Sequence, residues 1–232
     1  MNKVERIGNF VRTLSTDRFD RYLGLTDGNT DKALCLYACN ACLSQALYVP
    51  LQALEVTLRN SIHECLKTDM GEYWFDKPDL IVISHQFGQI GEAKAKLVQD
   101  RKSVLSPRVV AALPFGFWTT MFNSDYEELW RHHLCGIVLP EKREGITRKT
   151  FSGPLKLIRK IRNRIAHHEC IIELDLNNHY GQIKHLTGLL SPEARYWLEQ
   201  NSIFETVYGK EKALLDNIHG RKKSDARADT GT

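Results

Sequence analysis

Apolar residues recur along most of this chain at spacings of three and four, the period of an α-helix, and no series of alternating apolar and polar positions indicates paired strands. The clearest example is a stripe of apolar residues that would share one helix face: Leu51, Leu54, Leu58, Ile62 and Cys65. The pattern predicts an all-α fold, in which a short strand at 80–83 is the one exception that we consider.

Capping residues and prolines set the expected helix boundaries. Asp31 and Ser152 are reasonable N-caps, Pro154 suits a first helical turn, and Pro50 either opens a second helix or kinks a continuous one. We expect a helix from Ser152 through the basic motif described below, and further helices over these ranges: 31–49, 51–65, 88–102, 107–113, 125–134, 176–190, 192–200 and 203–219. Between them, 114–118 should form an apolar elbow and 140–145 a loop.

The organisation of the chain is predicted to be simple. No Gly/Ser-rich linker divides it, so we expect a single helical domain over 1–219, followed by a disordered, charged tail at 220–232. Charges interrupt the first thirty residues, which excludes the apolar region of a secretory signal, and no apolar run approaches the roughly 18 residues of a membrane span. We therefore expect a cytoplasmic protein that does not enter the membrane.

Composition is that of a globular protein, with 232 residues, 42% hydrophobic and 26% charged. Its six cysteines lie among apolar neighbours and are expected to be free buried thiols. Cys35, Cys39 and Cys42 have the spacing of an iron–sulfur motif, and the run from His167 to Cys170 suggests zinc, but helix packing explains both groups more simply. We expect neither metal nor cofactor.

Positive charge is concentrated in one stretch. The formal net charge is only +4, yet 145–168 contains no acid and seven basic residues: Arg148, Lys149, Lys156, Arg159, Lys160, Arg162 and Arg164. Such a field would attract phosphate groups and make binding salt-dependent. The alternative is an ordinary solvated helix face.

The same stretch carries the motif Arg-Asn-Arg-Ile-Ala-His-His-Glu at 162–169. An arginine can clamp a phosphate and neutralise charge that develops on it, and an imidazole can transfer protons near neutral pH. These are the groups that cleave RNA without a metal. Asn163 lies four residues before His167 and could fix its tautomer through a hydrogen bond.

The geometry of a straight helix places Arg162 inside the apolar face that is formed by Leu155, Ile158, Ile161, Ile165 and Ala166. A cation there needs a partner, so a purely structural pair with Glu169 or Glu55 is one interpretation. On an unbroken helix, Arg162 and His167 diverge by roughly 140°. Either the helix ends or bulges near Ala166, or two copies of the motif meet across a symmetric interface.

A second arginine–asparagine pair, Arg59 and Asn60, lies beside the apolar stripe, in line with Glu55 and His63. This line predicts either an i,i+4 ion pair or a polar cleft that faces the first motif.

The sequence resembles the Abi (abortive infection) family of bacterial proteins, within the HEPN superfamily. Arg162, Asn163, Ala166, His167 and His168 match the HEPN pattern of arginine, a polar residue, and histidine after four to six intervening positions. The likeness spans roughly 15–175 and is also carried by an earlier block: Arg18, Phe19, Tyr22, Ala33, Leu34, Leu36, Tyr37, Asn40, Leu43, Ser44, Ala46, Leu47, Leu51, Gln52, Leu54, Glu55, Val56, Leu58, Arg59 and Asn60. His63 misses the HEPN spacing.

The resemblance implies a HEPN-like helical bundle with additional helices that dimerises and joins two motifs into one metal-independent ribonuclease site. The implied catalytic residues are Arg162, His167 and Asn163. The supporting or RNA-binding candidates are His168, Glu169, Arg59, Asn60, Glu55, Arg164, Arg159 and Lys160. RNA is the expected partner, and an antitoxin or regulatory RNA is a further one. The alternative function is a non-catalytic RNA-binding or regulatory module.

Overall fold

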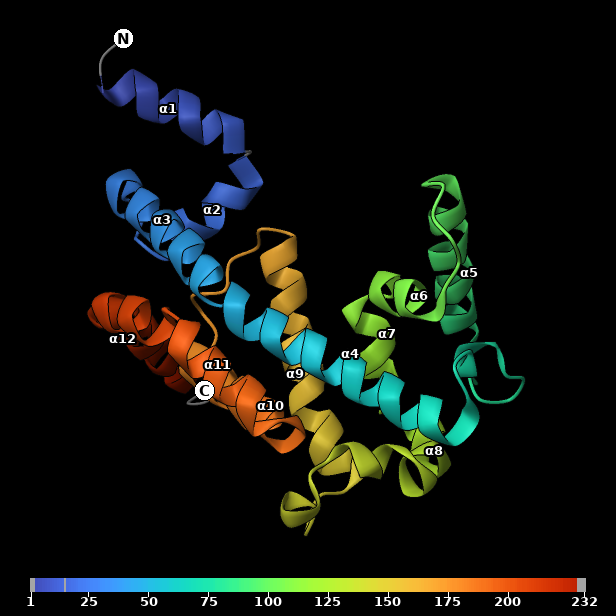
Figure 1. The fold of residues 1–232 in the computed structure, drawn as a ribbon. Helices are drawn as coiled ribbons and strands as arrows, with labels where there is room; N and C mark the ends of the chain where they lie inside the picture. The colour runs from blue at the N-terminus through green and yellow to red at the C-terminus, as the bar shows by residue number, and fades with distance from the viewer. Residues whose placement is uncertain (1–2, 15, 229–232) are drawn as a thin grey trace. The chain divides into compact units, whose positions relative to one another are not determined.

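The predicted all-α fold is confirmed by a computed structural model, which describes residues 3–14 and 16–228 (Figure 1). No strand occurs among these residues, so the strand considered at 80–83 is wrong. The α-helices are α1 Lys3–Leu14, α2 Thr16–Gly24, α3 Thr30–Ala46, α4 Tyr48–Met70, α5 Ser84–Gln99, α6 Ser106–Ala112, α7 Phe115–Thr120, α8 Glu127–His132, α9 Arg148–Ala166, α10 Leu176–Leu190, α11 Pro192–Asn201 and α12 Phe204–Ala228.

Two compact units divide the chain. Unit 1 comprises Met1–Tyr48, Ile161–Tyr180 and Ser202–Thr232, and unit 2 comprises Val49–Lys160 and Gly181–Asn201. The expectation of a single domain over 1–219 stays a prediction. The tail expected to be disordered from Gly220 is helical as far as Ala228, and 229–232 lie outside the described residues.

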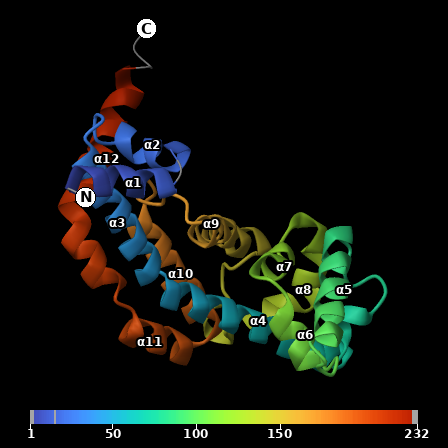
Figure 2. The same ribbon diagram turned by 90° about the horizontal axis from the view of Figure 1, so that it is seen from above.

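Unit 1 is organised around α3, which packs against α2 on one side and α12 on the other (Figures 1 and 2). Its buried residues Leu36, Cys39 and Leu43 lie on one face. The helix begins two residues earlier than a cap at Asp31 would allow, because the Asn29 side chain accepts a hydrogen bond from the Lys32 amide at 3.0 Å.

Unit 2 has an aromatic core. The indoles of Trp74 and Trp118 meet edge to face at 6.2 Å, and Phe122 lies 4.9 Å from Phe151, measured between ring centroids. Trp118 belongs to α7, so the expected apolar elbow is a short buried helix.

His63 belongs to this core rather than to a polar line. The residue is buried, and its Nδ1 accepts a hydrogen bond from the Trp74 indole at 3.1 Å. Burial lowers the pKa of His63 and outweighs the raising effect of Glu64 and Glu72, while Lys67 also lowers it. The folded protein therefore favours the neutral imidazole, which the hydrogen bond from Trp74 requires.

This environment makes stability depend on pH. Below about pH 6.5, His63 becomes protonated in the unfolded chain, while in the folded protein its lowered pKa keeps it neutral. The contribution of neutral His63 to the free energy of unfolding is therefore complete above that pH and is lost as the pH falls. We expect the melting temperature to fall less between pH 7 and pH 5 in His63→Gln than in the wild type. Identical pH profiles of the two proteins would contradict this assignment.

The start of α9 also differs from the prediction. Thr147 precedes the first residue, its hydroxyl accepts from the Thr150 amide at 3.1 Å, and the Thr150 hydroxyl accepts from the Thr147 amide at 2.8 Å. This reciprocal cap starts the helix at Arg148, upstream of the predicted cap at Ser152, and leaves Pro154 inside it.

One helical stretch has the length and composition of a membrane span. Within Thr30–Met70, an 18-residue window has a mean hydropathy of 1.3, and 44% of that window is buried inside the protein. The prediction that no such segment exists is wrong. Within this stretch, Leu36, Leu43, Leu54 and Leu58 are buried in the core.

Candidate functional site

The motif lies where α9 ends. The His168 amide donates to the Ile165 carbonyl at 3.0 Å and the Glu169 amide donates to the Arg164 carbonyl at 2.8 Å, which together form a Schellman turn. His168 occupies the left-handed position with φ of 56°, where glycine is the usual residue. A histidine in this conformation carries backbone strain that a glycine would not.

We therefore expect His168→Gly to raise the free energy of unfolding by about 1 kcal/mol, because glycine adopts this conformation without strain. His168→Ala, which removes the imidazole but keeps the strain, should give no such gain. Urea denaturation of the three proteins measures both effects. A gain of equal size in both variants would mean that the side chain, and not the backbone, is the source of the strain.

Two residues of the N-terminal helices hold this turn in place. Asn40 of α3, which is only 5% exposed, donates to the Glu169 carbonyl at 3.2 Å and accepts from the Ile171 amide at 2.7 Å. Arg18 of α2 donates to the His167 carbonyl at 3.4 Å. Both residues belong to the earlier block of the Abi resemblance, so the two blocks meet in unit 1.

Exposed polar residues form a line along α9 that leads to His167. Lys149, Lys156, Lys160, Asn163 and His167 are all exposed, and their spacings of seven, four, three and four keep them within about 60° on a helical wheel. Three of the seven basic residues predicted to form a positive field, Lys149, Lys156 and Lys160, therefore lie on the side of α9 that leads to the motif.

Arg162 lies on a different side of α9 and is half-buried. The helix ends at Ala166, which is one of the two arrangements considered for bringing Arg162 and His167 together. The His167 amide nevertheless donates to the Asn163 carbonyl at 2.9 Å, as it would within a helix. The chain changes direction only at His168. The helix end therefore does not by itself turn the His167 imidazole toward Arg162 of the same chain.

Glu169 forms an ion pair with Arg164 at 3.3 Å. The expected pairing of Arg162 with Glu169 or Glu55 stays a prediction. Arg159 donates to the hydroxyls of Thr119 and Thr120 at 3.4 and 3.2 Å, which gives it a structural role within unit 2.

The second arginine–asparagine pair lies in unit 2. Arg59 Nε donates to Asn60 Oδ1 at 3.3 Å, Asn60 is exposed and Glu55 is half-buried. That these residues face the motif stays a prediction.

A polar pocket of about 390 Å³ adjoins the motif within unit 1. It is lined by Asp17, Arg18, Arg21, Tyr22, Glu169 and Cys170. Arg21 is held in an ion pair with Glu173. Burial raises the pKa of the Cys170 thiol, and the nearby Glu173 raises it further, so this cysteine is a protonated wall residue and not a nucleophile.

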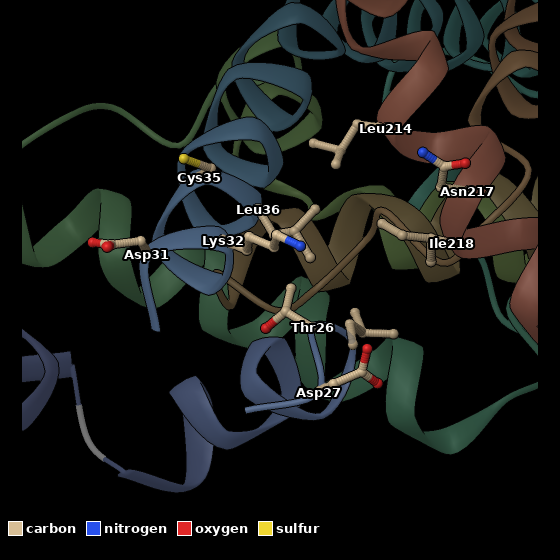
Figure 3. Close-up of a pocket in the computed structure, with 10 residues that line it drawn as sticks. Thr26, Asp27, Asp31, Lys32, Cys35, Leu36, Leu214, Asn217 and Ile218 are labelled. Carbon is tan, nitrogen blue, oxygen red and sulfur yellow. The ribbon is translucent and has the colours of Figure 1, made fainter. Parts of the chain in front are cut away.

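A larger cavity of about 660 Å³ lies between α3, α12 and the loop that follows α2, and no motif residue lines it. Figure 3 shows Lys32 and Leu36 of α3 projecting toward Leu214 and Ile218 of α12. Its lining is mainly apolar, and we assign it no chemistry.

The cysteines are free, but they are not all buried as expected, because Cys35 and Cys42 are exposed on α3. Within 3–14 and 16–228, no three His, Cys, Asp or Glu side chains are grouped to hold a metal ion.

The sequence did not predict that Arg18 and Asn40 hold the turn, although both residues carry the resemblance to the Abi family. Asn40 did give a signal, since it is a polar residue between Leu36 and Leu43 on the buried face of α3. A buried amide of this kind must bond to backbone groups elsewhere in the fold.

Comparison with known proteins gives one match. A family model described as "Abi-like protein" matches residues 4–173, which includes both the N-terminal block and the whole motif. No curated protein and no solved structure matches the chain at a significant level.

Proposed function

Because the chain belongs to the Abi-like protein family, we propose that it is a metal-independent endoribonuclease of the HEPN type, active in the cytoplasm. Membership of this family indicates a role in abortive infection, a form of phage defence. The observation that carries the enzymatic part is the exposed His167 at the end of a line of exposed lysines, on a turn held by Arg18 and Asn40.

The chemistry follows from these groups. His167 accepts the proton of a ribose 2′-hydroxyl, whose oxygen attacks the adjacent phosphorus and forms a 2′,3′-cyclic phosphate as the bond to the 5′-oxygen breaks. Arg162 stabilises the charge that develops on the phosphate oxygens, and a proton is delivered to the departing 5′-oxygen. Asn163 would orient His167. The exposed lysines of α9 would hold the RNA backbone, so binding should weaken as salt increases.

Both groups would reach one phosphate if two copies of the chain meet. On the helical wheel, Arg162 and His167 lie on different sides of α9, and a two-fold axis would bring the arginine of one copy to the histidine of the other. The protein would therefore act as a homodimer. An antitoxin or a regulatory RNA would restrain it by covering this interface.

The test is incubation of the purified protein with RNA and with DNA of the same sequence, with and without EDTA. We expect cleavage of RNA alone, insensitivity to EDTA, and products with 2′,3′-cyclic phosphate ends, because DNA lacks the attacking hydroxyl. Cutting that disappears with EDTA would reject the mechanism. RNA binding that His167→Ala leaves unchanged, without cleavage by the wild type, would favour a non-catalytic binding module.

A further inference from the structure

We propose that the polar pocket lined by Arg18 and Glu169 binds a guanine base of the RNA, next to the bond that is cut. The proposal rests on the proposed function, because it assigns a base-reading site to the same RNA. It goes further in naming the nucleotide that the enzyme selects.

The pocket is adjacent to the proposed catalytic histidine. Arg18 lines it and also donates to the His167 carbonyl at 3.4 Å. Glu169 lines it and follows His167 by two residues, a distance of at most about 7 Å along the chain. A base in this pocket therefore belongs to a nucleotide whose backbone passes close to His167.

The size and charge of the pocket favour a base over a phosphate. Its volume of about 390 Å³ accommodates a nucleobase with part of its ribose. Two arginines and two carboxylates line it, and Arg21 is further neutralised by Glu173, so the pocket carries no excess positive charge. Backbone phosphates would instead follow the exposed lysines of α9.

Guanine matches the remaining groups. Its Watson–Crick edge presents two adjacent N–H donors beside the O6 acceptor, and unpaired bases in RNA are read at this edge. The Glu169 carboxylate can accept both N–H groups, because each oxygen has a second lone pair while Oε2 remains 3.3 Å from Arg164. Arg18 can donate to O6, as arginines do when they read guanine in DNA. Adenine, cytosine and uracil do not offer this pair of donors.

The experiment measures binding of GMP, AMP, CMP and UMP to the full-length protein by calorimetry or NMR titration, so that it does not depend on cleavage. We expect GMP to bind about tenfold more tightly than the other three. Glu169→Gln should abolish this preference, because its amide group would face the N–H donors of guanine, while its oxygen can still accept from Arg164. Arg18→Ala should abolish it as well. Glu5→Gln and Arg6→Ala, at exposed positions of α1 outside the pocket, are matched controls that should retain it.

Equal binding of the four nucleotides, or a preference for GMP that survives Glu169→Gln, would overturn the proposal. Mapping of cleavage sites separates it from the proposed function. A protein that prefers GMP but cuts no RNA would support the guanine site and contradict the proposed nuclease function. RNA cleavage without any base preference near the cut would support the nuclease function and contradict the guanine site.

Discussion

Replacing His167 or Arg162 with alanine should each lower the rate of RNA cleavage by at least about a hundredfold, because the first removes the proton acceptor and the second removes the charge that stabilises the transition state. His167 is exposed, so its truncation removes no core packing. Arg162 is half-buried, and Arg162→Lys therefore provides a milder variant that keeps the charge but not the paired hydrogen bonds.

The control for these variants is Lys149→Ala, at the far end of the same line on α9. We expect it to weaken RNA binding and reduce its salt dependence, with less than a tenfold loss of cleavage rate at saturating RNA. Cleavage rates and melting curves of His167→Ala, Arg162→Ala, Arg162→Lys and Lys149→Ala test whether His167 and Arg162 act in the catalytic step. Folded His167→Ala protein that retains more than a tenth of the wild-type rate would remove His167 from the catalytic step.

Replacing Asn40 with leucine should lower the free energy of unfolding by about 2 to 4 kcal/mol, since the Glu169 carbonyl and the Ile171 amide both lose their hydrogen-bond partner. The same change should lower cleavage, because the turn that carries His167 and His168 loses its attachment to α3. Ser44→Ala is the matched control, as the Ser44 hydroxyl bonds to the Asn40 carbonyl within α3. Denaturation and cleavage measured on the same preparations test this pair. Equal stability of the two variants would mean that Asn40 does not hold the turn.

The positions of the helices could be predicted from the sequence, because the spacing of apolar residues indicates which face of a helix is buried. The range 176–190 was predicted with the bounds that α10 has. Of the predicted apolar face of α9, Leu155, Ile158 and Ile161 are buried, whereas Ile165 is half-buried and Ala166 is exposed. Caps were less accessible. Thr147 was missed because its reciprocal partner is Thr150 rather than the glutamate or glutamine of the usual motif.

The candidate catalytic groups could be found in one local run of the sequence, but the residues that hold this run in place could not. Asn40 and Glu169 are far apart in the sequence, and only the packing of α3 against the segment that follows α9 brings them together. The left-handed conformation of His168 was equally hidden, because a histidine at that position carries none of the signal that a glycine would. Long-range contacts and strained backbone therefore had to come from the structure.

The central claim is that Arg162 of one copy and His167 of another form one site, and mixing two inactive variants tests it most directly. Arg162→Ala and His167→Ala proteins are combined, allowed to exchange subunits, and assayed for RNA cleavage. Random exchange makes half of the dimers mixed, and each mixed dimer has one intact site of two, so we predict about a quarter of the wild-type activity. A mixture that is no more active than its two components would show that the two groups do not act across an interface.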